Sequence, residues 1–221
     1  MIWKARCETV IDGKDISVET IVYRIQYTVN DYLMYRKKDV KKISRDEDSR
    51  FLENKEKWLA PEEGWLKVNV DGAFDPGTSE GAVGIVARDH NGCLIGGTGM
   101  RVKVANAQAV EALAALKGCE LARDKGWPRV IVEMDSAETY SDITRKSDRF
   151  NWKQATVYEE IKRIKCQLTQ CKFSWVKRKA NEAANWVAKQ LNKGMELGNY
   201  TEHPSSFFVF ILNKNGLPCP P

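Results

Sequence analysis

Three acidic side chains and one amide occupy positions where packing alone would select an apolar residue. Asp71 and Asp135 each follow a short segment of apolar residues that is typical of a strand, and Gly72 then permits close approach of a ligand. Glu111 lies in an alanine-rich stretch, with small residues on its own helical face at i+4, i+7 and i+11. Asn185 lies among alanines in a later stretch. Because small residues let a helix lie close to a sheet, this pattern predicts that the helix face with Glu111 carries its carboxylate inward.

The chemistry that such a group could perform is the binding of divalent cations. Clustered carboxylates repel one another, and their burial favours the protonated form. Bound cations offset both effects, and Mg²⁺ prefers hard oxygen ligands supplied by a few carboxylates together with a phosphate. From spacing alone an alternative stays open, in which each carboxylate is separately solvated or paired with a lysine.

The elements that would position these side chains alternate between strand and helix. Alternating apolar residues, glycine turns and an alanine-rich periodic stretch predict the order β-β-β-α-β-α-α-β-α. The strands are expected over 66–71, 81–89, 93–102, 129–135 and 172–176, and the helices over 106–125, after Ser136, over 154–170 and over 181–192. Three antiparallel strands followed by alternating units imply an α/β fold with a mixed five-stranded sheet and helices on both faces.

Three regions differ in composition. Residues 1–60 form a charged helical appendage, residues 65–193 the compact α/β domain, and residues 194–221 an irregular tail. Within the appendage, apolar residues at helical spacing over 21–33 predict an amphipathic helix, and the basic run over 36–45 is either a nucleic-acid handle or a solvated helix face. Within the tail, the apolar segment 207–212 is either an extra strand or a packed segment.

Composition narrows the functional classes. The net charge of +5 and the pI near 8.8 are compatible with a nucleic-acid partner without requiring one. No apolar run approaches the roughly 20 residues that span a bilayer, and the N-terminus carries no secretory signal, so we expect an intracellular protein of the cytoplasm or nucleus. Six scattered cysteines and two histidines predict reduced thiols and no zinc site.

Four segments resemble, in order and spacing, the ribonuclease H type 1 family, particularly the plant ribonuclease H-like proteins derived from non-LTR retroelements. Residues 67–73 are similar to the first-strand motif, 109–113 to the first-helix glutamate, 132–136 to the fourth-strand aspartate and 178–185 to the closing helix. The segment Ile2 to Arg6 also resembles what precedes such domains. The resemblance covers about Trp65 to Lys193.

The resemblance implies that Asp71, Glu111 and Asp135 are catalytic metal ligands. It implies two Mg²⁺ (or Mn²⁺) ions that cleave the RNA strand of an RNA–DNA hybrid. Asn185 stands where the family commonly has a fourth carboxylate; an amide oxygen still ligates Mg²⁺ but adds no charge, so the second ion should bind more weakly. Cellular members often have a histidine before the last helix, which this chain lacks, as the plant group generally does.

The segment from Ile161 to Lys179 carries seven basic residues and no acidic one. This run is either a surface that follows the phosphate backbone or an exposed helix and strand edge. The residues expected to bind nucleic acid are Lys177, Arg178, Lys179 and Asn181. By strand alternation Trp175 lies on the same face as Phe173, and it is predicted to lie in the core.

Three functions remain open from the sequence. The chain is an active hybrid ribonuclease, a nucleic-acid-binding module that has lost efficient metal binding, or a retroelement remnant without selected biochemistry. The expected partner is an RNA–DNA hybrid or double-stranded RNA, with no membrane, no small-molecule cofactor, and a monomeric state. A dinucleotide-binding enzyme is disfavoured, because glycines 77, 81 and 84 do not follow the order of a phosphate-binding turn.

Overall fold

The computed structural model describes residues 57–144, 154–196 and 200–214. The helix expected over 21–33 and the basic run over 36–45 lie outside these residues. The described elements are β1 (Leu66–Asp75), β2 (Glu80–Arg88), β3 (Leu94–Lys103), α4 (Ala107–Asp124), β4 (Arg129–Met134), α5 (Ala137–Thr144), α6 (Ala155–Lys165), β5 (Gln170–Trp175), the short 3₁₀ helix η3 (Arg178–Asn181), α7 (Glu182–Asn192) and α8 (Ser206–Asn213).

The five strands form one mixed sheet in the order β3-β2-β1-β4-β5. β1 pairs antiparallel with β2, and β2 with β3, whereas β4 runs parallel to both β1 and β5. The β2–β3 hairpin closes through Gly92, whose φ of +80° is accessible to glycine without strain. The α/β class and the mixed five-stranded sheet predicted from the sequence are therefore confirmed.

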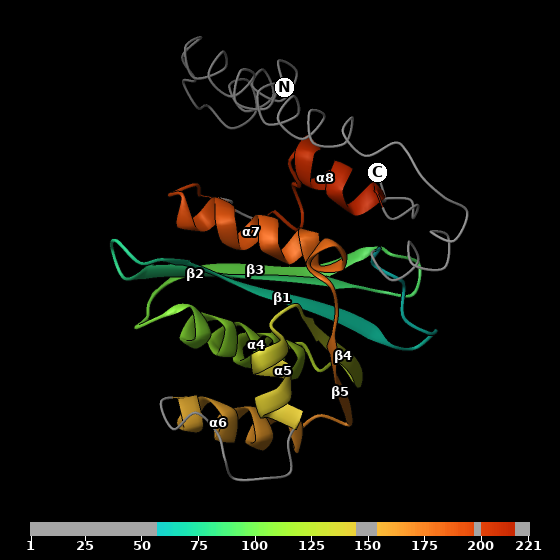
Figure 1. Ribbon diagram of the computed structural model, residues 1–221. Coiled ribbons are helices and arrows are strands. Elements are labelled where there is room, and N and C mark those ends of the chain that lie inside the picture. The colour runs from blue at the N-terminus through green and yellow to red at the C-terminus, as the bar shows by residue number, and fades with distance from the viewer. Residues whose placement is uncertain (1–56, 145–153, 197–199, 215–221) are drawn as a thin grey trace, which may run out of the picture. The chain divides into compact units, whose positions relative to one another are not determined.

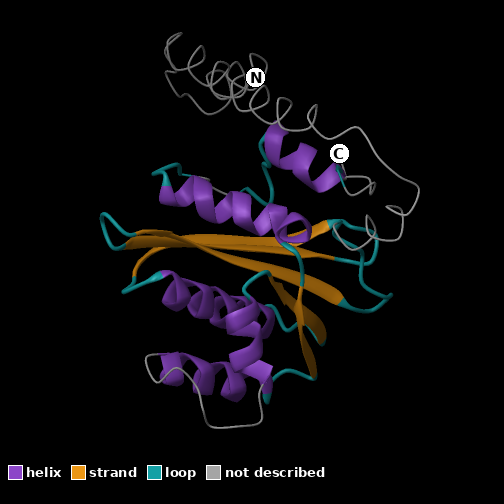
Figure 2. Ribbon diagram, viewed as in Figure 1, coloured by secondary structure: helices purple, strands orange, loops and turns teal. Residues whose placement is uncertain are grey.

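Helices cover both faces of the sheet, as Figure 2 shows. α7 packs on β1, β2 and β3 from one side, with α8 on its outer surface (Figure 1). α4 packs on β1 and β2 from the other side, with α6 beyond it. One core of buried apolar side chains lies between the sheet and α4, and a second cluster joins α7 and α8 to Val86 of β2. β1 is the central strand and is covered on both faces.

Glycines allow the two long helices to approach the sheet closely. A Cβ at Gly118 of α4 would lie 2.5 Å from Cγ1 of Val70 on β1. A Cβ at Gly84 of β2 would lie 2.4 Å from the carbonyl oxygen of Ala184 on α7. These distances are far below van der Waals contact, so larger residues there would push the helices away from the sheet.

Helix α6 is shorter than the sequence predicted. The expected helix extended to Gln170, but α6 ends at Lys165. The chain then turns, with the N–H of Gln167 donating to Ile164 O at 2.8 Å, and the N–H of Gln170 donates to Pro128 O at 3.0 Å as β5 begins. The turn before β5, and Gln170 at the start of β5, therefore occupy residues that local propensity alone would place in the helix.

The prediction of an irregular tail is wrong for residues 206–213, which form helix α8. Of the two alternatives for 207–212, the extra strand is wrong, and the packed segment is confirmed. The hydroxyl of Ser205 caps the helix by accepting from the N–H of Phe208 at 3.2 Å. Phe208 is buried and stacks on Trp186 of α7 with the ring centroids 5.2 Å apart. A short apolar run fits either a strand or a helix, and the cap together with packing on α7 selects the helix.

Residues just before β1 belong to the compact unit. Trp58, assigned from the sequence to the N-terminal appendage, is only 2% exposed. The turn expected over 60–64 is present, with the N–H of Trp65 donating to Glu62 O at 3.1 Å. Among the described residues, no helix is both long and apolar enough to cross a membrane.

Candidate metal centre

Two of the predicted acidic residues lie at equivalent positions on neighbouring strands. The parallel pairing of β1 with β4 ends at Asn69 and Glu133. Asp71 and Asp135 each come two residues later. β4 ends at Met134, whereas β1 continues along β2 to Asp75. Asp71 therefore lies inside a strand and not at its end, and the end of β4 leaves a gap on one side of it.

Glu111 reaches this gap from the first turns of α4. A Cβ on Gly72 would lie 2.9 Å from the backbone nitrogen of Glu111, so the absence of a side chain at Gly72 is what brings the helix here. The backbone N–H of Gly72 donates a hydrogen bond to the Glu111 carboxylate. The helix start is fixed by Asn106, whose side chain accepts from the N–H of Ala109 at 2.9 Å.

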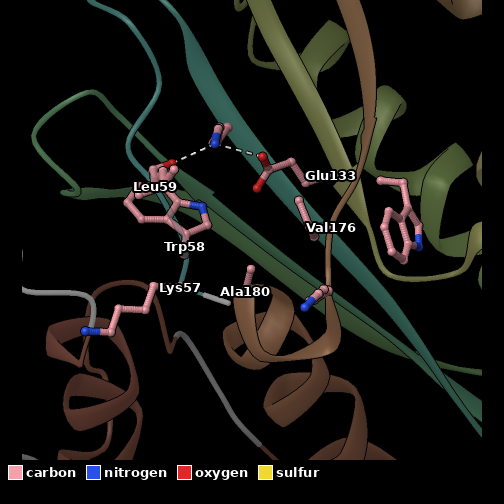
Figure 3. Close-up of a pocket in the computed structure, with 9 residues that line it drawn as sticks. Lys57, Trp58, Leu59, Glu133, Val176 and Ala180 are labelled. Atoms are coloured by element: carbon pink, nitrogen blue, oxygen red, sulfur yellow. Dashed lines mark hydrogen bonds and ion pairs between the residues drawn. The ribbon is translucent and has the colours of Figure 1, made fainter. Parts of the chain in front are cut away.

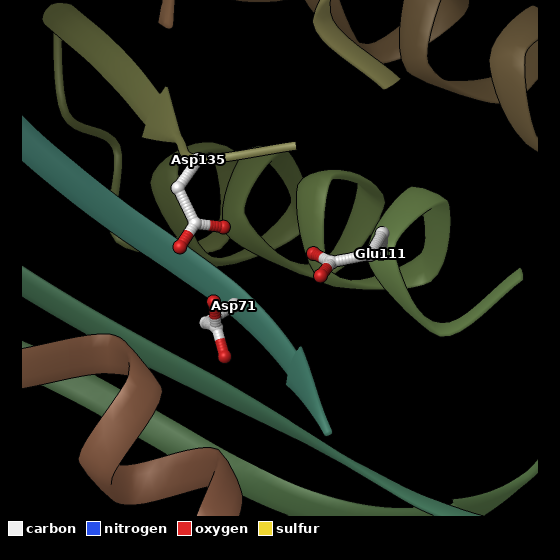
Figure 4. A group of neighbouring side chains, drawn as sticks. All are labelled: Asp71, Glu111 and Asp135. Carbon is white, nitrogen blue, oxygen red and sulfur yellow. The ribbon is translucent and has the colours of Figure 1, made fainter. Parts of the chain in front are cut away.

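The three carboxylates meet at one place, as Figure 4 shows. One oxygen from each of Asp71, Glu111 and Asp135 lies within 4.8 Å of the others. Asp71 is 2% exposed, and the side chain of Asp135 is 5% exposed. A donor set of three hard, anionic oxygens at this spacing suits Mg²⁺ or Mn²⁺. The residues brought together are those that the sequence singled out.

Burial and mutual repulsion hold protons on this cluster. Burial, followed by the charges of Glu111 and Asp135, raises the pKa of Asp71 well above its ordinary value. Burial, followed by the charge of Asp135, raises the pKa of Glu111 to about 7. Near neutral pH the cluster is therefore short of its full negative charge, and a bound cation would compete with protons.

Arg178 supplies the opposing positive charge. Its Nε donates to Asp135 Oδ2 at 3.1 Å, while its side chain is 74% exposed. The charge of Arg178 lowers the pKa values of Asp71 and Glu111 in part, without cancelling the effect of burial. An exposed arginine is easily displaced, so this pair is compatible with exchange for a divalent ion or a phosphate.

The remaining predicted site residues occupy different environments. Lys177 and Lys179 are exposed beside Arg178, and their role in nucleic-acid binding stays a prediction. Asn185 is 8% exposed on α7, and its role as a metal ligand also stays a prediction. Asn181 is fully buried, with its Nδ2 donating to Val70 O at 2.9 Å. Its burial does not fit the expected contact with nucleic acid.

Trp175 is not a core residue as the sequence predicted. It is 47% exposed at the last position of β5, an edge strand. Its indole N–H donates to Asp135 O at 3.0 Å and so borders the carboxylate cluster. Alternation places Trp175 on the face of Phe173, but it does not reveal that β5 ends at this residue on an edge of the sheet.

Sequence reasoning overlooked a group of buried polar side chains behind the carboxylates. Asn69, Arg88 and Glu133 are at most 3% exposed. Burial lowers the pKa of Arg88 to about 9, so its guanidinium stays charged at neutral pH. The available signal was a polar residue of β1, Asn69, which lies two residues before Asp71 and so on the same face of the strand.

Comparison with known proteins agrees with this arrangement. A model of the family described as reverse transcriptase-like matches residues 69–191, more than half of the chain. The chain belongs to the reverse transcriptase-like family. The matched range holds every residue of the carboxylate cluster, while Trp58 and α8 lie outside it.

A curated relative of this reverse transcriptase-like chain is the Arabidopsis thaliana protein named "Putative ribonuclease H protein". It is 27% identical over 134 residues, which are 61% of this chain and 21% of the relative. The chain thus spans about a fifth of that protein's length.

Solved structures with a similar fold include ribonuclease H1 of Halobacterium salinarum, with a TM-score of 0.55 and 20% identity, covering 59% of this chain and 99% of that one. Another is LC11 ribonuclease H1 in complex with an RNA/DNA hybrid, with a TM-score of 0.53 and 16% identity, covering 59% and 99%. The described domain therefore has the ribonuclease H-like fold.

Proposed function

We propose that this protein is a metal-dependent endonuclease that hydrolyses the RNA strand of RNA–DNA hybrids. The observation that carries the proposal is the convergence of Asp71, Glu111 and Asp135, with one oxygen from each within 4.8 Å of the others. The ribonuclease H-like fold and a structural neighbour solved with a bound RNA/DNA hybrid support it. An unneutralised carboxylate cluster destabilises a fold, so its presence is best explained by a cationic ligand.

The residues of this chain would divide the work as follows. Asp71, Glu111 and Asp135 would hold two divalent ions, and the amide oxygen of Asn185 would complete the weaker of the two sites. Ions held there would supply activation of the attacking water and stabilisation of the leaving 3′ oxygen. Arg178 turns from Asp135 to a substrate phosphate, which its exposed guanidinium is able to reach as a bidentate donor.

Cleavage of a labelled hybrid in the presence of Mg²⁺ tests the proposal. Wild-type protein should cleave the RNA strand, and Asp71→Asn should not. Asp124→Asn is the matched control, because it is the same change at an exposed position on the last turn of α4. Equal cleavage by wild type and Asp71→Asn, or no metal-dependent cleavage by wild type, would overturn the assignment. Double-stranded RNA and DNA duplexes, run in parallel, report substrate preference.

A second candidate function is a binding module of retroelement origin with little or no turnover. Asn185 favours it, because an amide in place of a carboxylate supplies no charge to the second ion. Titration with Mn²⁺ separates the two functions. Binding of two ions favours the nuclease, whereas hybrid binding without a second metal site favours the module.

A further inference from the structure

Four buried polar side chains behind the carboxylate cluster form one hydrogen-bonded chain. Asn69, Asn181, Arg88 and Glu133 are between 0% and 3% exposed. Asn69 Nδ2 donates to Glu133 Oε2 at 3.1 Å and to Asn181 Oδ1 at 3.1 Å, and its Oδ1 accepts from Arg88 Nη2 at 3.2 Å. The side chain of Asn69 is therefore the branching point of the network.

The chemistry of the two charged members sets the direction of every bond in this network. A guanidinium can only donate, so Arg88 requires the oxygen of Asn69 to face it. The charged carboxylate of Glu133 can only accept, so the Nδ2 of Asn69 faces Glu133 and also donates to Asn181. Asn181 must then present its own oxygen to Asn69. Its Nδ2 is left facing β1, where it donates to Val70 O at 2.9 Å and Asp71 Oδ1 at 3.4 Å.

Residues before the family-matched range hold the far end of this network. The guanidinium of Arg88 lies 3.5 Å from the ring centroid of Trp58. Lys67 Nζ bridges Glu133 Oε1 at 2.8 Å and Leu59 O at 2.6 Å (Figure 3). These contacts lie beside a cavity of about 260 Å³ to which none of the three clustered carboxylates contributes. The matched range starts at residue 69, so the segment 57–59 lies outside it.

We propose that Asn69 is a positioning residue for Asp71 that acts through Asn181, with Arg88 and Trp58 fixing its orientation. This inference rests on the proposed metal chemistry and names the residues that prepare one ligand for it. The network delivers an N–H to one oxygen of Asp71, which limits rotation of the carboxylate and leaves its other oxygen for a cation. Partners of this kind, one bond removed from a metal ligand, affect metal affinity by roughly 10–100-fold.

The decisive variant is Asn69→Asp, which keeps the size of the side chain and reverses the network. An aspartate accepts from Arg88 as before but has no N–H to give. Asn181 would have to turn its Nδ2 toward residue 69 and present its oxygen to Asp71. We expect Mn²⁺ affinity to fall about 10-fold. Asn69→Ala should give a similar loss, and Gln190→Ala, which removes another buried amide on α7, should give none.

Metal titration of the full chain by calorimetry is the first measurement, because it does not depend on hydrolysis. If the variants are active, raising the Mg²⁺ concentration should restore cleavage by Asn69→Asp but not by Asp71→Asn, with the KM for hybrid unchanged. A residue with a merely structural role would lower thermal stability without this metal-dependent rescue. Equal Mn²⁺ affinity in wild type, Asn69→Asp and Asn69→Ala would overturn the proposal.

A second measurement without metal separates this proposal from the proposed function. In EDTA, the effects of Asn69→Asp and Asp71→Asn on the unfolding equilibrium constant should depend on each other. The effect of the double variant should differ by about 3-fold or more from the product of the two single effects, because the network couples the two positions. If the two substitutions are coupled but the wild-type protein binds no metal, the proposed nuclease function is wrong and the positioning role of Asn69 is retained. If the two effects are independent and the wild-type protein binds metal, the positioning role of Asn69 is wrong and the proposed function is retained.

Discussion

Replacing Glu111 by glutamine should stabilise the protein when no metal is present. The substitution keeps the shape of the side chain and removes one of three clustered negative charges. Burial and the charge of Asp135 raise the pKa of Glu111 from 4.5 to about 7. At 1.36 kcal/mol for each pKa unit, this difference corresponds to a penalty of about 3 kcal/mol when the group is ionised. That figure is a ceiling, since Glu111 keeps some contact with solvent.

The sign of the effect follows from proton binding. Between pH 4.5 and 7, folded Glu111 binds a proton that the unfolded chain has released, so wild-type stability falls as pH rises through this window. Below pH 4.5 both states are protonated, and the charge-dependent difference between the variant and wild type disappears. Above pH 7 the difference reaches its full value. The advantage of Glu111→Gln should thus grow steadily between these limits.

Urea unfolding followed by circular dichroism measures this advantage. Wild type and Glu111→Gln are compared in EDTA at pH 4.5, 6 and 8, with Glu63→Gln as an exposed control of the same chemistry. Adding Mg²⁺ at pH 8 should stabilise wild type more than Glu111→Gln and reduce or reverse the difference. If Glu111→Gln is no more stable than wild type at pH 8 in EDTA, the reasoning about the cluster is refuted.

Three further changes test other parts of the site. Gly72→Ala places a Cβ 2.8 Å from the backbone carbon of Val110, so it should lower stability by roughly 1–3 kcal/mol in urea unfolding and weaken Mn²⁺ binding in calorimetry. Unchanged metal affinity would show that close approach of α4 is unnecessary. Asn185→Asp adds a carboxylate at the weaker site and should tighten binding of a second ion several-fold in the same titration; no change would remove residue 185 from the ligand set. Substituting both Lys177 and Lys179 by alanine should make the dependence of log affinity for hybrid on log salt concentration less steep by about 2. Fluorescence anisotropy measures this slope, and an unaltered slope would place neither lysine near a phosphate.

The sequence predicted the elements that local patterns control. Alternation of apolar and polar residues in β1 and the alanine-rich face of α4 follow directly from strand and helix periodicity. These patterns also identified Asp71 and Asp135, because each follows an apolar strand segment, and Glu111, because helical periodicity places it on a face of small residues. Resemblance of four ordered motifs to one family then made the convergence of three distant segments predictable.

Other features required the tertiary structure. Trp175 is exposed because β5 ends there, and α6 stops early because the chain must turn to pair β5 with β4. Periodicity describes a residue's direction within an element but not which neighbour covers it or where pairing ends the element. The same reason hid helix α8, since an apolar run of six residues has no preferred period of its own.

The sequence by itself thus determined which groups could hold a cation, and the fold decided how they are held. Asn181 was expected to bind nucleic acid, yet it is buried because η3 and α7 place it against β1. Asn69 and Arg88 are 19 residues apart and on different strands. A hydrogen bond between such groups depends on the register of the whole sheet, which no local pattern specifies.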